Sequence, residues 1–282
     1  MCDSQNEFPK TTSPLRFRRR HVSLWATVMV AGFMLGGRAA QAAELSSETN
    51  QRPIPEIKWD TTLRKFLFDR EKFIGQRLTV NCPPASPNQD LSGVFGTGNY
   101  PSESSICVAA MHAGVITKDG GPVTIQLNPG LTEYIGSESH GVSTGTLPGT
   151  EFSMAFVTNE NREENDRIRL EYLPRIDWNT KFTSTGLAYR DLVGQRFTFR
   201  VPSAPVDRRM RIVYGTDHYD FSSNLPVAAL HAGVITKEGG LITVQLDYGK
   251  GKLVGSIRNG VETKSKNGRD RSLSFVTVET SK

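Results

Sequence analysis

The sequence predicts an α+β protein of two tandem small domains, in each of which a short central α-helix is wrapped by antiparallel β-sheets. Three observations support this fold class. First, the chain repeats itself at an offset of 119 residues, so that Val108–Leu127 returns as Val227–Leu246 with 15 of 20 residues identical. Second, apolar residues alternate with polar ones in both copies, which is typical of half-buried strands. Third, a segment between those strands is apolar on nearly every side, as in a buried helix.

The repeat also predicts the domain boundaries. The two copies align without a gap from Pro55 to Thr158, which indicates two copies of one compact unit. We expect a first domain over residues 55–160 and a second over 174–282, joined by a charged linker over 161–173. The end of this linker is compatible with a short strand or with a helical turn.

The first 42 residues resemble a secretory signal peptide. Basic residues at 16–20 precede an apolar stretch, Val22–Leu35, and then Ala40-Gln41-Ala42, in the order of the three regions of such a leader. Because the apolar stretch is short for a bilayer span, cleavage after Ala42 is favoured over a retained anchor. Residues 43–54 would then be a flexible lead-in, and the protein would be secreted or periplasmic with no transmembrane span.

Charge argues against a nucleic-acid partner. The whole chain has a formal net charge of +5, but removing residues 1–42 leaves 28 basic and 27 acidic residues. The alkaline isoelectric point therefore comes mostly from the leader and does not indicate nucleic-acid binding. The remaining charges are unevenly divided, with 10 basic and 15 acidic residues over 55–173 and 17 basic and 10 acidic residues over 174–282.

Each copy is predicted to contain three main strands and a hairpin. The first strand has one apolar face, formed by Leu78, Val80 and Cys82 or by Phe197, Phe199 and Val201, and one wet face, which includes Thr79 or Thr198. The second strand follows two glycines, and its apolar residues are Val123, Ile125 and Leu127 or Ile242, Val244 and Leu246. The closing strand contains Phe152, Met154 and Phe156 or Leu273 and Phe275. Asn259-Gly260 predicts a hairpin turn, and His140-Gly141 is its counterpart.

The central segment of each copy predicts a short buried helix. In the first copy it is expected over Ser104–Ala113, with Ser104 as N-cap and Gly114 after its end. In the second copy Pro226 lacks the amide hydrogen that a helix interior requires. Proline is tolerated in the first turn, so Ser223 is expected to be the N-cap there. Such an apolar helix must be covered by sheets on more than one side.

These motifs resemble the LCCL domain family. In the first copy the similarity covers most of residues 73–158 and rests on Cys82-Pro83, Phe95-Gly96-Thr97, Ser104-Ser105-Ile106-Cys107, His112-Ala113-Gly114-Val115-Ile116 and Gly120-Gly121. In the second copy it rests on Tyr214-Gly215-Thr216, Ser222-Ser223, His231-Ala232-Gly233-Val234-Ile235 and Gly239-Gly240. The resemblance implies an extracytoplasmic α+β module with a central helix wrapped by β-sheets. The chain departs from the family pattern of four cysteines, and Phe95 and Tyr214 stand where a tryptophan is usual.

Cys82 and Cys107 are predicted to form a disulfide bond. Val201 and Pro226 replace both of them in the second copy, as expected for a bonded pair, and export permits oxidation. A metal site built on two free thiols is disfavoured, because no histidine or second cysteine pair lies at ligand spacing. We therefore expect no metal and no cofactor.

His112 and His231 occupy the same position of the two predicted helices. Histidine is a common acid–base group near neutral pH, but the neighbouring alanines and Gly114 favour a structural role. In that role the buried ring would hydrogen-bond a backbone carbonyl. Contact with a ligand is the alternative.

No catalytic motif is shared by the two copies. Gly141-Val142-Ser143-Thr144-Gly145 matches the letters of a nucleophile elbow, but no helix is predicted after it, as that motif requires. The second copy has Gly260-Val261-Glu262-Thr263-Lys264 at the same place, without the serine. We therefore expect a protein that is not an enzyme.

Basic residues of the second copy are the candidate ligand-binding residues. They fall in predicted loops and turns, and the six candidates are Arg208, Arg209, Arg211, Lys250, Lys252 and Arg258. Clustered on one face, they would attract the phosphate or sulfate groups of lipids or polysaccharides. The alternatives are ordinary solvated charges, or charges that face the acidic first copy.

The sequence therefore predicts an exported, non-enzymatic recognition or interaction protein. The resemblance suggests an anionic lipid, a lipopolysaccharide or another surface glycan as its ligand. A second hypothesis is a structural spacer or assembly element of the cell envelope, in which the copies pair through their opposite charges. A hydrolase is the least favoured function, and the sequence leaves the ligand and the oligomeric state open.

Overall fold

The computed structural model describes residues 54–67, 70–187, 192–205 and 212–276. All of them belong to one compact unit, Asn50–Lys282. The predicted leader over 1–42 and almost all of the lead-in over 43–54 lie outside the described residues, and so do Arg208, Arg209 and Arg211.

The first copy contains two short helices, a 3-10 turn and eight strands, within the described residues. They are α1 Leu63–Phe66, η1 Arg70–Phe73, β1 Arg77–Cys82, β2 Asn99–Pro101, α2 Ile106–His112, β3 Gly121–Pro129, β4 Glu133–Tyr134, β5 Glu138–Ser139, β6 Val142–Ser143, β7 Leu147–Pro148 and β8 Phe152–Phe156. The helix α3, Arg162–Tyr172, follows and leads into the second copy.

The second copy follows the same plan, with a 3-10 turn in place of α1 and one additional short strand, β10. Its elements are η2 Phe182–Ser184, β9 Arg196–Val201, β10 Gly215–Thr216, β11 His218–Tyr219, α4 Leu225–His231, β12 Gly240–Tyr248, β13 Lys252–Leu253, β14 Ile257–Arg258, β15 Val261–Glu262, β16 Lys266–Asn267 and β17 Arg271–Phe275. The main strands and the central helix therefore lie where the repeat predicts them.

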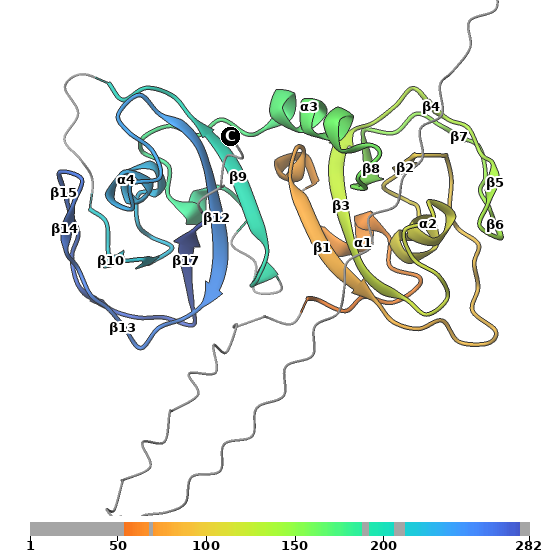
Figure 1. Cartoon of the computed structure of the whole chain (residues 1–282), viewed down its shortest axis with the longest axis horizontal. Helices are drawn as coiled ribbons and strands as arrows, with labels where there is room; N and C mark the ends of the chain where they lie inside the picture. The colour runs from red at the N-terminus through yellow and green to blue at the C-terminus, as the bar shows by residue number, and fades with distance from the viewer. Residues whose placement is uncertain (1–53, 68–69, 188–191, 206–211, 277–282) are drawn as a thin grey trace, which may run out of the picture. The chain divides into compact units, whose positions relative to one another are not determined.

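Each copy has one main antiparallel sheet and two short antiparallel pairs. The main sheets have the strand orders β1-β3-β8-β2 and β9-β12-β17-β11-β10, and Figure 1 shows them in the two halves of the molecule. The short pairs are β4–β7 and β5–β6 in the first copy and β13–β16 and β14–β15 in the second. The predicted α+β class with antiparallel sheets is confirmed.

The central helices are buried, as their composition predicts. All seven residues of α2 and all seven of α4 are buried. Beyond its main sheet, α2 contacts β6 and α4 contacts β15, so each helix is covered on a second side by a hairpin. The hairpin turns contain His140 and Asn259 with φ of 49°, a left-handed conformation that histidine and asparagine adopt more readily than most residues.

The predicted N-cap of the first helix is wrong by one residue. Ser105 is the N-cap of α2, and its hydroxyl accepts a hydrogen bond from the Val108 amide while donating to the Trp59 carbonyl. The hydroxyl of Ser104 is engaged elsewhere, since it accepts from the Phe95 amide at 3.0 Å. The first serine therefore anchors a neighbouring loop, and the second begins the helix.

The second copy shows the same shift. Asn224 is the N-cap of α4 and accepts from the Val227 amide at 3.2 Å, while Ser223 accepts from the Tyr214 amide at 3.0 Å. Pro226 is then the second residue of the helix, within the first turn, where amide hydrogens have no partner inside the helix. The prediction that proline is tolerated there is confirmed, although the cap is Asn224 and not Ser223.

The edge strands β1 and β9 face each other and are joined by glutamine side chains. The Gln76 amide donates to the Thr198 carbonyl and accepts from the Thr198 amide, both at 2.8 Å. The Gln195 amide makes the same two bonds to Thr79, at 2.8 Å and 2.9 Å. Because both pairs are equivalent under the repeat, the contact has the reciprocal form of a two-fold interface.

This contact explains one departure from the predicted strand pattern. Thr198 was expected on a wet face of its strand, but it is 3% exposed. Gln76 pairs with its backbone, and Arg169 of α3 donates to its hydroxyl at 2.6 Å. The alternation in β1 is as predicted, with Leu78, Val80 and Cys82 all buried.

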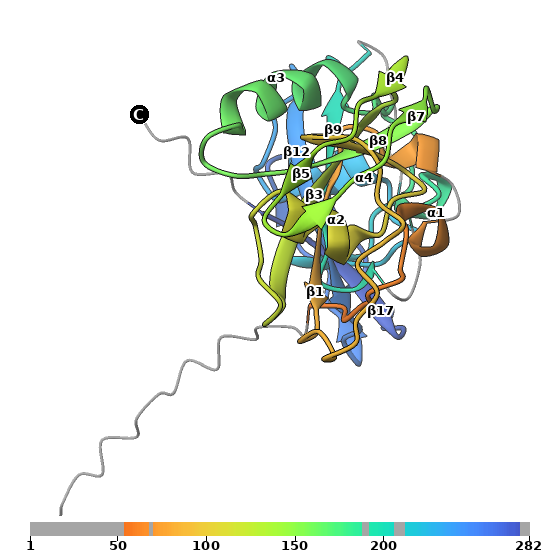
Figure 2. The same cartoon turned by 90° about the vertical axis from the view of Figure 1, so that its right-hand side faces the viewer.

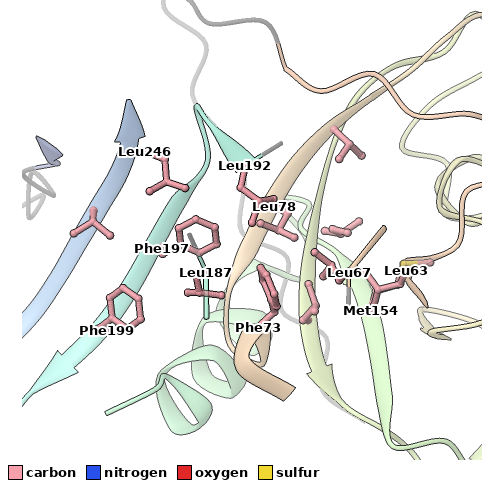
Figure 3. Close-up of a cluster of buried hydrophobic side chains, with 14 of the residues drawn as sticks. Leu63, Leu67, Phe73, Leu78, Met154, Leu187, Leu192, Phe197, Phe199 and Leu246 are labelled. Carbon is pink, nitrogen blue, oxygen red and sulfur yellow. The ribbon is translucent and has the colours of Figure 1, made fainter. Parts of the chain in front are cut away.

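Apolar side chains continue the contact between the copies. The rings of Phe73 and Phe197 lie 6.1 Å apart in an edge-to-face arrangement, which is favourable for aromatic pairs. Figure 3 shows Phe73 and Leu78 facing Leu187, Leu192 and Phe197 across the space between β1 and β9. The buried residues of both copies form one hydrophobic cluster.

The charged segment over 161–173 forms the helix α3. Its residue Asn165 is buried, and the Asn165 carbonyl accepts from the Gln126 amide of β3 at 2.8 Å. Asp166 pairs with Arg77 of β1 at 2.6 Å, and the Leu170 carbonyl accepts from Arg200 of β9 at 2.6 Å. The two views show α3 beside strands of both copies (Figures 1 and 2), so this segment packs on both copies.

Candidate recognition site in the second copy

The two cysteines of the described chain are joined as a disulfide. Cys82 ends β1 and Cys107 lies in α2, with their Cα atoms 5.8 Å apart and a sequence separation of 25. Both are at most 1% exposed. The bond ties the main sheet of the first copy to its central helix, and in the second copy Val201 and Pro226 fill the same places.

His112 is the centre of a chain of hydrogen bonds in the first copy. Its Nδ1 lies 2.9 Å from the Tyr100 hydroxyl, and its Nε2 lies 3.2 Å from the Ser137 hydroxyl. Ser137 in turn lies 2.7 Å from the Thr97 hydroxyl. We expected the ring to hydrogen-bond a backbone carbonyl; its nitrogens lie within hydrogen-bond distance of the hydroxyls of Tyr100 and Ser137, and the backbone of Ser137 also raises the pKa of the ring.

The second copy contains the equivalent chain around His231. Its Nδ1 lies 2.8 Å from the Tyr219 hydroxyl, and its Nε2 lies 3.2 Å from the Ser256 hydroxyl. Ser256 lies 2.8 Å from the Thr216 hydroxyl. The same four residue types thus hold the central helix to the surrounding loops in both copies.

Burial determines the protonation of these groups. It is the main cause of the lowered pKa of His112 and of His231, which are 2% and 0% exposed. Burial also raises the pKa of Tyr100 and of Tyr219 to about 12. Both histidines are therefore neutral, and both tyrosines are protonated, near neutral pH.

The chain of hydroxyls does not form a catalytic triad. A serine nucleophile needs a base oriented by a third group that stabilises the imidazolium, usually a carboxylate, and here the third group is a protonated tyrosine. Ser143 of the accidental elbow motif lies at the end of β6, which is followed by the strand β7 and not by a helix. The described residues also include no group of three His, Cys, Asp or Glu side chains placed to hold a metal ion.

A pocket of about 410 Å³ opens at the surface end of the hydroxyl chain in the second copy. Thr216 and Ser256 of that chain line it, together with two of the predicted ligand-binding residues, Lys250 and Lys252. Both lysines are exposed, and neither has an ion-pair partner among the described residues. The tertiary structure therefore brings two unpaired cations and two hydroxyls to one concave surface.

The carboxylates near this pocket have cationic or polar partners. Asp217, at its edge, accepts from the guanidinium of Arg258 at 2.6 Å. Asp247 is buried; its Oδ2 is 3.2 Å from Nδ1 of His218, which lines the pocket, and its Oδ1 accepts from Gln245. Arg258 is thus close to the pocket but already paired with Asp217.

The other basic residues of the second copy do not join this group. Lys266 pairs with the buried Asp220 at 3.0 Å and lies 4.7 Å from the centre of the Tyr214 ring. Arg271 lies over the Phe221 ring at 5.2 Å. Of the six candidates, Lys250 and Lys252 line the pocket, Arg258 pairs with Asp217 of its lining, and the three arginines at 208, 209 and 211 lie outside the described residues.

The equivalent surface of the first copy has different chemistry. Leu131 and Glu133 stand in place of the two lysines, and Asn99 and Asn128 stand in place of His218 and Asp247. Leu131 is 44% exposed and Ile135 is 68% exposed. The two copies therefore share a framework but present different surfaces.

Sequence reasoning missed His218, Thr216 and Ser256 as parts of this site. The signal was available in the repeat, because the second copy replaces two asparagines by His218 and Asp247 at a fixed offset. Substitutions that change charge on an otherwise repeated framework point to the surface on which the copies differ. What the repeat could not show is that these positions surround one pocket.

In the part of the chain that the structure describes, no helix is long and apolar enough to cross a membrane.

Comparison with known proteins agrees with the fold. Human cysteine-rich secretory protein LCCL domain-containing 2 is 30% identical over 197 residues, which are 65% of this chain and 35% of that protein. Cochlin of Cavia porcellus is 37% identical over 87 residues, 31% of this chain and 15% of that protein. Clotting factor C of Tachypleus tridentatus is 31% identical over 101 residues, 36% of this chain and 9% of that protein. The chain thus covers about a third or less of each of these relatives.

The family comparison covers both copies. The model of the LCCL domain matches residues 57–154 and again residues 176–273. These two segments contain both central helices, both hydrogen-bonded histidines and all but the last two residues of each main sheet. The chain belongs to the LCCL domain family, and it contains two LCCL domains in tandem.

Proposed function

We propose that this protein is an exported, non-catalytic recognition protein whose second LCCL domain binds an anionic ligand, such as an anionic lipid, a lipopolysaccharide or a polysaccharide. The observation that carries the proposal is the pocket in which Lys250 and Lys252 stand without acidic partners among the described residues. Unpaired cations in a concave site attract anionic groups more strongly than scattered surface charges do.

The duplication supports recognition over catalysis. The interior groups repeat in both copies, including the tyrosine, histidine, serine and threonine chain, so they serve the fold that the copies share. The charges that differ between the copies lie on the surface, at Lys250 and Lys252 against Leu131 and Glu133. Loops that vary in sequence on a shared framework are typical of binding modules.

Extracytoplasmic localisation is supported by two independent features. Residues 1–42 resemble a secretory leader, and the described chain contains a disulfide between Cys82 and Cys107, which is stable outside the cytosol. The name of one relative also describes a secretory protein.

The test is co-sedimentation with vesicles of phosphatidylcholine alone and with added phosphatidylglycerol, and in parallel a pull-down on immobilised lipopolysaccharide and sulfated polysaccharide. We expect binding to at least one anionic partner, weakened by the double variant Lys250→Gln/Lys252→Gln and by added salt. Lys237→Gln is the matched control, because Lys237 is an exposed lysine of the same domain outside the pocket. Absence of binding to every anionic partner contradicts the proposal.

A structural spacer is the second candidate function. As first formulated, it requires the copies to pair through opposite charges. Within the described residues, the contacts beside β1 and β9 are instead amide–backbone bonds and apolar packing, as in Gln76–Thr198 and Phe73–Phe197. A spacer held in this way would keep its dimensions in high salt, whereas charge pairing would make small-angle scattering depend on salt.

A further inference from the structure

The hydrogen bonds that link the tyrosine, histidine, serine and threonine of each copy, here called the hydroxyl chain, run in one direction, so that each group donates its proton to the next. Among the described residues, Nδ1 of His112 is the only acceptor within hydrogen-bond distance of the Tyr100 hydroxyl, so the tyrosine proton is donated to that nitrogen. The neutral ring then carries its proton on Nε2 and donates it to Ser137. Each later hydroxyl must therefore donate outward, away from the buried tyrosine.

In the first copy this chain closes on a backbone carbonyl. Ser137 donates to Thr97, and the Thr97 hydroxyl donates to the Ile135 carbonyl at 2.9 Å. Every proton along the chain thus has an acceptor within the domain. The outermost hydroxyl has no donor left for a ligand.

In the second copy the same chain ends at the pocket. Nδ1 of His231 is likewise the acceptor for the Tyr219 hydroxyl, so Tyr219 donates to His231, His231 donates to Ser256, and Ser256 donates to Thr216. Among the described residues, the Thr216 proton has no acceptor, although Thr216 lines the pocket. A hydroxyl whose lone pair already accepts from Ser256 is fixed as a donor toward the pocket.

The donor set of the pocket selects an oxyanion. Lys250 and Lys252 supply two ammonium groups, and Thr216 supplies an oriented neutral donor. Asp217 is paired with Arg258, and Asp247 is buried, accepts from Gln245 and does not line the pocket. Three donors with two positive charges match a phosphate group, which offers three terminal oxygens and close to two negative charges at neutral pH.

We propose that the pocket formed by Thr216, Lys250 and Lys252 binds a phosphate group, and that the first copy lacks this site because its hydroxyl chain is closed on the Ile135 carbonyl. The inference rests on the proposed function and identifies the group that the second domain recognises. The phosphate can belong to a lipid headgroup or be free in solution, because the pocket chemistry is the same for both.

The experiment compares equivalent hydroxyls in the two copies of the full chain. Binding of inorganic phosphate is measured by calorimetry, and binding to vesicles of phosphatidylcholine with and without phosphatidic acid by co-sedimentation. We expect Thr216→Val to lower the phosphate affinity about tenfold, as expected for loss of a hydrogen bond to a charged group. Thr97→Val, which removes the equivalent hydroxyl of the first copy, should leave the affinity unchanged.

Two further variants keep the result interpretable. Thr216→Ser retains the hydroxyl and should restore binding, which excludes a general defect in folding. Lys252→Glu, which introduces the residue that the first copy has, should abolish phosphate binding. Binding of phosphate but not of phosphatidic acid identifies a free phosphate compound as the source, and the reverse identifies a headgroup.

Three outcomes would overturn the inference. The first is an equal effect of Thr216→Val and Thr97→Val, and the second is a sulfate affinity equal to that for phosphate in all variants. The third is binding to anionic vesicles that depends on Lys250 but not on Thr216, in which case the proposed function stands and the phosphate site does not. Absence of binding to any anion removes both.

Discussion

The side-chain amide of Gln76 pairs with both backbone groups of Thr198, a residue 122 positions away, through two hydrogen bonds of 2.8 Å. Gln195 and Thr79 form the equivalent pair in the opposite sense. The glutamine amide presents a donor and an acceptor just as a neighbouring strand would, and so it satisfies the edge of the sheet. Unpaired strand edges invite aggregation, and here the two long edges protect each other.

Substitution of Gln76 should therefore destabilise the whole unit. Gln76→Leu removes both bonds and leaves the Thr198 amide and carbonyl without partners in a buried place, at a cost of about 2–4 kcal/mol. Urea unfolding measures this change. Gln89→Leu, at a partly exposed glutamine of the first copy, is the control and should change stability by less than about 0.5 kcal/mol.

Because the Gln76–Thr198 and Gln195–Thr79 pairs are equivalent, we expect equal effects from substituting either glutamine. Gln195→Leu should cost about as much as Gln76→Leu, and each variant should unfold in a single transition because the copies share one core. Separate transitions for the two copies would contradict the shared core.

The disulfide should stabilise the first copy by limiting its unfolded state. The loop closed by Cys82 and Cys107 spans 25 residues, which corresponds to about 3 kcal/mol in the chain-entropy model. Reducing agent, or the double variant Cys82→Ala/Cys107→Ala, should lower the urea midpoint accordingly. Titration of the protein from residue 43 onward under denaturing, non-reducing conditions should find no free thiol, and two free thiols would rule out the bond.

Acid should destabilise the fold through the two buried histidines. The pKa of His112 and of His231 is lowered from 6.5, chiefly by burial, so the unfolded chain binds protons more readily than the folded one. Their contribution to stability is therefore complete above about pH 6.5 and is lost as the pH falls toward the lower folded pKa.

The matched test of this pH dependence uses His112→Gln and His231→Gln. Glutamine keeps polar groups near the hydroxyl partners but does not titrate in this range. Each variant should reduce the slope of stability against pH below 6.5, as measured by urea unfolding at a series of pH values. An unchanged slope in the double variant would show that other groups control the acid response.

Gly239 and Gly260 allow the cost of a left-handed backbone conformation to be distinguished from the cost of a steric clash. Gly239 and Gly260 have φ of 81° and 73°, but a Cβ at Gly239 would lie 2.3 Å from the Val201 carbonyl oxygen, whereas a Cβ at Gly260 meets nothing within 4 Å. Gly260→Ala should cost about 1 kcal/mol from the left-handed conformation. Gly239→Ala should cost about 3 kcal/mol, because a backbone carbonyl must also move. Thermal unfolding of both variants measures the difference.

Several elements could be predicted from the sequence because their signals are local. The alternation of Leu78, Val80 and Cys82 follows from the two-residue period of a strand, and the apolar segment around Ala109 can only be a buried helix. The N-caps were misplaced by one residue because Ser104 and Ser105 have the same capping ability. Only the loop that contains Phe95 decides which of the two serines is free to cap.

The repeated motifs of the sequence by themselves determined the α+β class and the two LCCL domains, since alternating strands, an apolar helix and a duplicated segment are local patterns in the chain. The tertiary structure alone decided that Gln76 meets Thr198, that α3 packs on both copies, and that Thr216, Lys250 and Lys252 surround one pocket. Those relationships depend on how two folded surfaces fit together over more than 100 residues of chain. A polar side chain gives no sign in the sequence of which distant donor or acceptor it will satisfy.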